Sequence, residues 1–335
     1  LRLFGPSPVA NDKSSVQLPY SEKSGKELVA YYPYDAYVEK IWTDLNRADS
    51  LLKAVDPVQR LTFEELNNPN TLLKNYKIID NFQCYRRVRF NYWALKAFKA
   101  RVALYLGDNQ TAYENAMVVI NARVADKPVG DMSVIIQDIN AEWYTLPSET
   151  LFAINAYDLI DKVQNIFKNT QNVLYKYETE TELQKDLFEN QSSDYRLKLW
   201  TDMSYKEQRQ VSIKKYWQVD EKEEKEAITY GQQIPILRMS EVYLIAVETA
   251  PSLSEGNEKL DIFRKDRGLL TKNCSTYEEL KYEVLKEYQK EFYAEGQMFF
   301  TYKRIGAKEM IGKENRPIEL SEYRIPLPET EFSYQ

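Results

Sequence analysis

The feature that most constrains this chain is the stretch 91–120, which carries two amphipathic helices around a single short break. In its first half, apolar residues recur every three or four positions, as on one face of a 3.6-residue helix. Gly107 then ends the helix, because glycine takes the left-handed conformation without steric cost, and Asp108 or Asn109 can cap the next helix. The two matching apolar stripes consist of Trp93, Ala97, Ala100 and Leu104, and of Ala112, Ala116, Val119 and Ile120.

Alanines in both stripes allow the two helices to approach each other closely. A tight antiparallel pair with a short turn is the unit of a tetratricopeptide solenoid. The same pattern also fits an ordinary helical hairpin in another all-α protein, because the alanine pattern of the repeat is permissive. Taken alone, residues 91–120 leave both folds open.

The composition of the whole chain favours helix. Only 10 of its 335 residues are glycine, about half the average frequency, which disfavours sandwiches, barrels and Gly-rich dinucleotide folds. The chain also has 26 tyrosines, whose rings can stack on a ligand while the hydroxyl stays in water. We therefore expect a mainly α protein that binds something through aromatic side chains.

Several kinds of chemistry are excluded by what the sequence lacks. The net charge is −6 and the pI about 5.2. Binding of the nucleic-acid phosphate backbone needs a positively charged surface, so this composition disfavours a nucleic-acid-binding protein. Without any histidine, imidazole catalysis and most zinc sites are ruled out. No P-loop, Gly-rich phosphate motif or metal cluster occurs, so we expect no enzyme activity and no cofactor. Cys84 and Cys274 are far apart, and the sequence leaves open whether they pair.

The remaining chain is read as further helices with irregular connections. The apolar runs, such as 242–247, are too short to span a bilayer. We expect long loops at 5–33 and 56–85, with short helical turns at 63–66 and 71–75, and an extended tail at 321–335. The predicted helices are 35–55, one beginning at Pro235 and ending before Pro251, 255–267, and 276–302 with a capping box at Thr276 and Glu279; the predicted strands are 150–156 and 211–217.

Charged residues near these helices favour structural roles over ligand binding. Arg86, Arg87 and Arg89 are expected on a solvated helix face, ahead of an anion site. Glu291 and Glu295 lie one helical turn apart, whereas a glycosidase needs carboxyls that face each other across the substrate. We expect Arg304 or Lys290 to partner these two glutamates, and Arg238 to form a structural pair with Glu241.

Taken in order, six stretches resemble motifs of the SusD/RagB family of outer-membrane nutrient-binding lipoproteins. Two departures are a lysine at Lys290, where the family usually has arginine, and Glu248-Thr249-Ala250-Pro251, where alanine usually follows the glutamate directly. The stretches are 1–6 (LRLFGP), 97–108 (AFKARVALYLGD), 235–248 (PILRMSEVYLIAVE), 262–269 (IFRKDRGL), 290–296 (KEFYAEG) with Arg304-Ile305-Gly306, and 323–329 (YRIPLPE).

The resemblance implies one SusD-like domain over 1–335, built of tetratricopeptide-like helical repeats with long irregular loops and a few short β-strands. Within it we expect repeat helices and a long loop at 1–125, an irregular aromatic segment at 126–234, and repeat helices with the tail at 235–335. Because 1–6 looks like the last turn of a helix, we expect the chain to be a piece of a longer protein. Its lipidated cysteine and the first helix of the first repeat would lie upstream.

By the same resemblance, the protein would capture nutrient at the cell surface, anchored by lipid in the outer membrane, and deliver it to a SusC-like, TonB-dependent transporter. Sugar rings stack on aromatic faces and need polar groups at their edges, so an oligosaccharide is the favoured ligand. A peptide ligand, as in the RagB branch, and a tetratricopeptide interaction scaffold remain alternatives. The candidate ligand residues are Trp143, Tyr157, Tyr175 and Trp200 as stacking platforms, with Asp194 and Arg196 as polar contacts.

Overall fold

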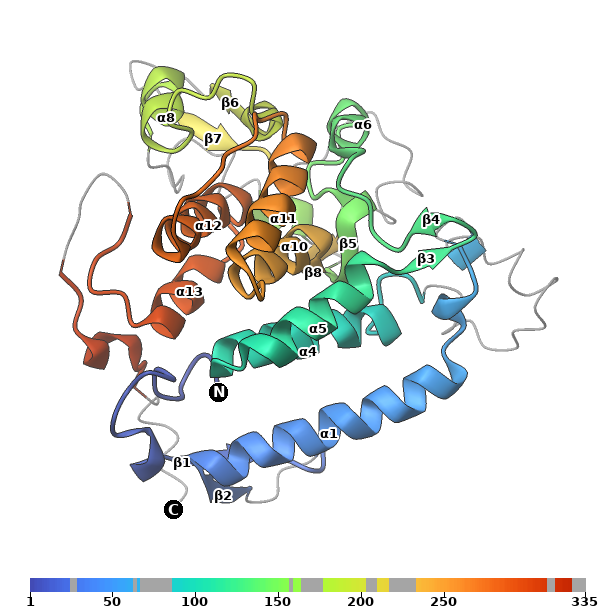
Figure 1. The fold of residues 1–335 in the computed structure, drawn as a ribbon, viewed down its shortest axis with the longest axis vertical. Helices are drawn as coiled ribbons and strands as arrows, with labels where there is room; N and C mark the ends of the chain where they lie inside the picture. The colour runs from blue at the N-terminus through green and yellow to red at the C-terminus, as the bar shows by residue number, and fades with distance from the viewer. Residues whose placement is uncertain are drawn as a thin grey trace.

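Most of the protein consists of helices packed as antiparallel pairs (Figure 1). The structure is a computed structural model that describes residues 1–24, 29–62, 65–66, 86–156, 159–163, 177–202, 210–216, 233–311 and 317–326. The helices are α1 (Tyr34–Val55), α4 (Tyr92–Leu106), α5 (Asn109–Ile120), α6 (Ile135–Asn140), α7 (Leu159–Val163), α8 (Glu180–Asp186), α10 (Met239–Glu248), α11 (Leu253–Asp266), α12 (Tyr277–Glu291) and α13 (Gln297–Ile305).

The strands form four small antiparallel ribbons of two strands each. They are β1 (Gln17–Tyr20) with β2 (Ala30–Pro33), β3 (Arg123–Val124) with β4 (Lys127–Pro128), β5 (Thr150–Asn155) with β8 (Gln233–Arg238), and β6 (Trp200–Asp202) with β7 (Val211–Ile213). Short 3-10 turns occupy Lys13–Ser15, Pro57–Gln59, Pro147–Glu149, Tyr195–Leu199 and Leu320–Tyr323.

The predicted hairpin is confirmed as α4 and α5. The Asn91 side chain caps α4 by accepting the Ala94 N–H at 2.9 Å, and Asp108 caps α5 by accepting the Thr111 N–H at 3.0 Å. Gly107 between them has φ +83°, the left-handed conformation that favours glycine. The alanines of both stripes are completely buried, so the two helices pack closely.

A second pair, α10 and α11, stacks on the first, and α12 packs against both of its helices. Figure 1 shows α10 and α11 above α4 and α5, with the long α1 crossing below them and α12 and α13 to one side. One hydrophobic core runs through α4, α5, α10, α11 and α12. The predicted repeat-helix architecture is therefore confirmed, and so are the helices at 35–55 and 255–267 and the strand at 150–156.

The last long helix was predicted as continuous over 276–302, and this is wrong. Thr276 caps α12 as expected, accepting the Glu279 N–H at 3.1 Å, but α12 ends at Glu291. Ala294 and Gly296 then take positive φ values of +64° and +68°, and the chain restarts as α13. The break puts Glu295 next to Lys215 and Arg238.

Three other segments differ from the prediction. The stretch that begins at Pro235 starts as strand β8, with Pro235 opposite Ala153 of β5, and the helix begins only at Met239. The expected loop at 5–33 contains the β1–β2 ribbon, whose side chains are mostly exposed and therefore lack the apolar alternation of a strand. The 211–217 strand is shorter than predicted, since β7 ends at Ile213.

The segment 126–234 holds short helices that the sequence did not reveal. α6 and α8 have six and seven residues, too few for a helical period to show. Together with β6 and β7 they form a second, smaller hydrophobic cluster at the upper edge of the molecule (Figure 1). Cys274 is a buried free thiol; Cys84 and the helical turn at 71–75 lie outside the described residues, as does most of the 321–335 tail.

Candidate ligand-binding site

One buried carboxylate, that of Glu291 at the end of α12, is the centre of a network of ion pairs. Its Oε1 accepts a hydrogen bond from Arg238 Nη1 at 2.6 Å. Its Oε2 accepts from Arg267 Nε at 2.9 Å and from Arg196 Nη1 at 3.3 Å. All four side chains are buried, so three guanidinium groups share one carboxylate away from water.

Glu287, one helical turn earlier, extends the network toward α11. Its carboxylate pairs with Arg196 at 2.7 Å, Lys290 at 3.0 Å and Arg264 at 3.2 Å. Arg264 belongs to α11 and Arg196 to the 3-10 turn Tyr195–Leu199. The network therefore holds the segment between α8 and β6 against the repeat helices.

Two more glutamates complete the network at its other end. Glu149, just before β5, pairs with Arg267 at 2.8 Å. Glu295 pairs with Arg238 at 2.7 Å and also with Lys215. Arginines from β8 and α11 thus meet acids from three separate segments, and the motif stretches at 235–248, 262–269 and 290–296 converge on one point.

The predicted partners of Glu291 and Glu295 were Arg304 and Lys290, and this is wrong. The break between α12 and α13 carries Arg304 away from both glutamates. Arg304 instead binds Glu248 with both nitrogens, Nη1 to Oε1 and Nη2 to Oε2, each at 2.8 Å. A helix break that the pattern did not reveal therefore changed the pairing.

Two other predicted arrangements of charge are also wrong. Arg238 and Glu241 do not pair with each other: Arg238 points into the network, and Glu241 pairs with Arg101, whose Nε lies 2.6 Å from its Oε1. The arginines at 86–89 lie in a turn before α4 and not on a helix. Arg86 pairs with Asp56 at 2.8 Å and Arg87 is buried.

The pKa values of these buried glutamates depend on the balance between burial, which raises the pKa, and neighbouring cations, which lower it. Burial alone would raise the pKa of Glu287, but Arg196 and Lys290 outweigh it and lower the pKa to about 2. Burial opposes the charge of Glu291 as well, yet Arg267 and Arg238 hold its pKa well below the usual range. At Glu149 burial dominates and raises the pKa. Glu291 and Glu295 therefore serve the packing of the protein, and no acid/base pair across a substrate is formed by them.

Half of the predicted ligand residues belong to this interior. Asp194 caps the 3-10 turn and binds Arg196 through both oxygens, with Nη2 at 2.7 Å and Nε at 2.9 Å. Trp200 is 8% exposed and packs edge-on against Tyr293, with the ring centroids 4.7 Å apart. Their burial argues against direct contact with a ligand. The aromatic and polar composition of the segment did not reveal that these three side chains are buried.

The other predicted residues are not brought together with these three. Trp143 is half-buried in the turn after α6, and its role as a stacking platform stays a prediction. Tyr157 and Tyr175 lie outside the described residues. Near Trp143, the Lys214 ammonium lies 4.5 Å from the centre of the Tyr144 ring, which shows that aromatic and basic groups do meet on this side.

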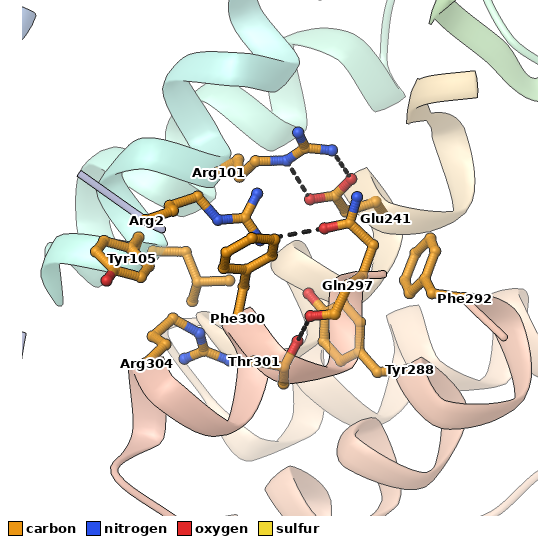
Figure 2. A pocket seen from close by; sticks show the side chains of 11 residues that line it. Arg2, Arg101, Tyr105, Glu241, Tyr288, Phe292, Gln297, Phe300, Thr301 and Arg304 are labelled. Carbon is orange, nitrogen blue, oxygen red and sulfur yellow. Dashed lines mark hydrogen bonds and ion pairs between the residues drawn. The ribbon is translucent and has the colours of Figure 1, made fainter. Parts of the chain in front are cut away.

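Figure 2 shows a polar hollow where the start of the chain meets α4, α10 and α13. Arg2 donates to Gln297 at 3.1 Å and lies over the Phe300 ring at 4.3 Å. The Arg101–Glu241 pair closes one side of the hollow (Figure 2). Its free volume is about 20 Å³, which is room for one water molecule, so it is too small for a nutrient.

Two larger hollows lie on the repeat helices. One has a volume of about 400 Å³, lies between α1 and α4, and is lined mainly by apolar side chains such as Ile41 and Phe98. The other, of about 540 Å³, lies between α5, the α10–α11 turn and α12, and carries tyrosines and polar side chains. The sequence did not indicate the second hollow, because its residues come from three segments that each read as an ordinary helix end.

Comparisons with known proteins agree with this architecture. A sequence model described as the SusD family matches residues 157–326, just over half of the chain. A SusD superfamily protein from Bacteroides thetaiotaomicron has a similar structure, with a TM-score of 0.69 and 20% identity over 99% of this chain and 72% of that one. No curated protein sequence matches.

Two further similar structures carry functional names. Surface glycan-binding protein A from Bacteroides uniformis has a TM-score of 0.64 and 15% identity over 99% of this chain and 72% of that one. A laminarin-binding SusD-like protein has a TM-score of 0.57 and 16% identity over 87% of this chain and 66% of that one. At these identities the similarity demonstrates a shared fold. Among the described residues, no helix is long and apolar enough to cross a membrane.

Proposed function

Because the chain belongs to the SusD family, we propose that it is a cell-surface nutrient-binding protein that captures an oligosaccharide and delivers it to a SusC-like, TonB-dependent outer-membrane transporter. The observation that carries this proposal is the family match over residues 157–326. Two proteins of the same fold are named for binding laminarin and surface glycans, which favours a saccharide as the ligand.

The ligand would lie on the irregular segment 126–234, with Trp143, Tyr157 and Tyr175 as stacking platforms. Flat aromatic rings suit the apolar C–H faces of sugar rings. The buried side chains of three residues that were also predicted to contact the ligand would instead stabilise this segment from the protein interior. They are Asp194, Arg196 and Trp200. In this arrangement the ion-pair network keeps a binding surface in place from inside the protein.

The protein would bind its nutrient without changing it. The buried glutamates of the network are all engaged by arginine or lysine, and most glycoside hydrolases need a carboxylic acid that can give its proton to the leaving sugar. A reducing-sugar assay with each bound oligosaccharide is expected to show no increase in the concentration of reducing ends. Sustained release would contradict the binding-only role.

Outer-membrane location would come from a lipid anchor upstream of Leu1, and the full domain over 1–335 would be one SusD-like unit. The partner is tested by pull-down of the full-length protein from an outer-membrane extract. Recovery of a TonB-dependent transporter is expected. Recovery of cytosolic proteins alone would favour the tetratricopeptide scaffold instead.

The ligand class is tested on an array of immobilised glycans, with an array of peptides beside it. Saturable binding to at least one glycan is expected. Binding to peptides alone would replace the saccharide with a peptide ligand, and binding to neither would remove the nutrient-capture proposal.

A further inference from the structure

A surface groove on the repeat helices has the shape and the chemistry of a ligand site. It is the hollow of about 540 Å³ between the start of α5, the α10–α11 turn and the start of α12, and we call it the tyrosine groove. Its volume falls within the range of about 300 to 1,000 Å³ that small-molecule sites occupy. Its lining residues are Asn109, Gln110, Tyr113, Glu114, Tyr277 and Lys281, with the turn 248–251 as the floor.

Two tyrosines of the groove are fixed by hydrogen bonds, one to the first turn of α11 and one to the turn between α10 and α11. The Tyr113 hydroxyl, from α5, hydrogen-bonds to Glu255 Oε2 at 3.2 Å, at the start of α11. The Tyr277 hydroxyl, from α12, donates to the Pro251 carbonyl at 3.4 Å. Both rings are therefore held in place before any ligand arrives. A ring that is already ordered loses less conformational entropy when a ligand binds.

The polar groups of the groove surround these rings. Gln110 donates to Glu114 at 2.9 Å, which fixes an amide and a carboxylate on the α5 side. Lys281 is exposed on the α12 side, and among the described residues no carboxylate pairs with its ammonium group. Asn109 is also exposed and carries no side-chain hydrogen bond within the described part of the chain. Donors and acceptors are thus available along both walls.

The groove continues along α12 into a second hollow of about 260 Å³. Glu248 and Lys281 line both hollows, and the second one adds Tyr282, which is 52% exposed. Arg304 also lines it and holds Glu248 in place through two hydrogen bonds of 2.8 Å. A chain-like ligand could therefore extend from one tyrosine to the next along this face.

Aromatic faces surrounded by amide, carboxylate and ammonium groups suit a polyhydroxylated ring better than a peptide. A peptide added as a strand needs a sheet edge with unpaired backbone groups, whereas the walls of this groove are the first turns of helices and offer no sheet edge. The floor combines the polar residues Glu248 and Thr249 with Ala250 and Pro251, and among the lining residues no aliphatic side chain larger than proline is present to receive a peptide anchor.

We propose that the tyrosine groove is a second oligosaccharide site, separate from the irregular segment 126–234. The inference rests on the proposed function, because it assumes that the protein binds saccharides. A longer glycan would contact both sites or two glycans would bind independently. In either case Tyr277 would stack on a sugar ring.

The test is isothermal titration of the full chain with laminarihexaose, maltohexaose and xylohexaose, in parallel for the unchanged protein and for three variants. Tyr277→Ala removes the ring, Tyr277→Phe keeps it, and Tyr31→Ala removes another exposed tyrosine, on β2 and away from the groove. A stacked ring contributes about a three- to tenfold difference in affinity. We expect Tyr277→Ala to lose that factor or one of two binding events. Tyr277→Phe keeps the ring but loses its bond to Pro251, so it should bind more tightly than Tyr277→Ala, and Tyr31→Ala should bind as the unchanged protein does.

The outcomes separate the two proposals. If a hexasaccharide binds and Tyr277→Ala changes neither affinity nor stoichiometry, the second site is refuted while the proposed function stands. If none of the three binds the unchanged protein, the saccharide function fails for these glycans and the second site fails with it. Thermal unfolding of Tyr277→Ala checks that a loss of binding does not come from unfolding, and a crystal soaked with the bound hexasaccharide would show density over Tyr277.

Discussion

Replacing Glu291 by glutamine tests whether the ion-pair network stabilises the fold. Glutamine keeps the size and shape of the side chain but removes the charge that Arg196, Arg238 and Arg267 share. Before the change, five carboxylates face six cations at the centre of the network, and Glu189 also pairs with Lys290 from its edge at 3.5 Å; afterwards four central carboxylates face the same six cations. The carboxylates are Asp194, Glu149, Glu287, Glu291 and Glu295, and the cations are Arg196, Lys215, Arg238, Arg264, Arg267 and Lys290.

Removing one partner of a buried ion pair costs about 3 to 5 kcal/mol, because the remaining charge stays buried without compensation. We expect a loss in the free energy of unfolding within this range, which is a large part of the roughly 5 to 15 kcal/mol that a domain has. The measurement is urea unfolding at pH 7, followed by circular dichroism.

A matched control is Glu258→Gln, since Glu258 carries the same charge on α11 but its side chain is 63% exposed and, within the described part of the chain, pairs with Lys259 alone. We expect a change of no more than about 0.5 kcal/mol there. If Glu291→Gln lowered stability by no more than the control, or raised it, the network would not have the structural role assigned to it.

Two further predictions concern the pH dependence of stability and the glycine that follows α11. Glu287 titrates near pH 4.5 when unfolded but has a folded pKa of about 2, so the unfolded chain takes up the proton first and stability falls as the pH drops from 4.5 toward 2. The loss is up to about 3 kcal/mol, and urea unfolding at a series of pH values should show a flatter profile for Glu287→Gln. Gly268→Ala should lower stability by about 2 kcal/mol or more, because φ is +76° and a Cβ would lie 2.6 Å from the Ser193 carbonyl. Gly107→Ala, at φ +83° with nothing within 4 Å, should cost only about 1 kcal/mol, and equal losses in thermal unfolding would refute the steric argument.

The repeat helices could be predicted because their patterns are local. The α4–α5 hairpin follows from alanine spacing, Gly107 and Asp108, all within 30 residues of chain. The helix predicted at 255–267 likewise matches α11, which is followed by Gly268 at φ +76°. Each of these signals acts on neighbouring residues, so no knowledge of the tertiary structure was needed.

The features that the sequence missed depend on contacts between distant segments. The break after Glu291 is stabilised where Glu295 reaches Lys215 and Arg238, 80 and 57 residues away in the chain. Strand β8 exists because β5 lies beside it, and a short run from Pro235 does not distinguish strand from helix. Contacts between residues far apart in the sequence therefore determine both the helix break after Glu291 and strand β8.

The candidate site was predicted less well for a related reason. Composition identified an aromatic, polar segment but not which of its side chains face inward. Asp194 and Arg196 look like ligand contacts in sequence, yet both are engaged in the buried network. In contrast, Tyr113 and Tyr277 belong to helices that looked ordinary, and only the fold brings them to the same groove.

Titration calorimetry of the full-length protein measures oligosaccharide capture itself. Laminarihexaose, maltohexaose and xylohexaose are titrated separately, and a pool of tryptic peptides is titrated under the same conditions. We expect saturable binding of at least one hexasaccharide, weakened by Trp143→Ala or Tyr277→Ala, and no comparable heat from the peptides. Saturable binding of the peptides with none of any saccharide would contradict oligosaccharide capture.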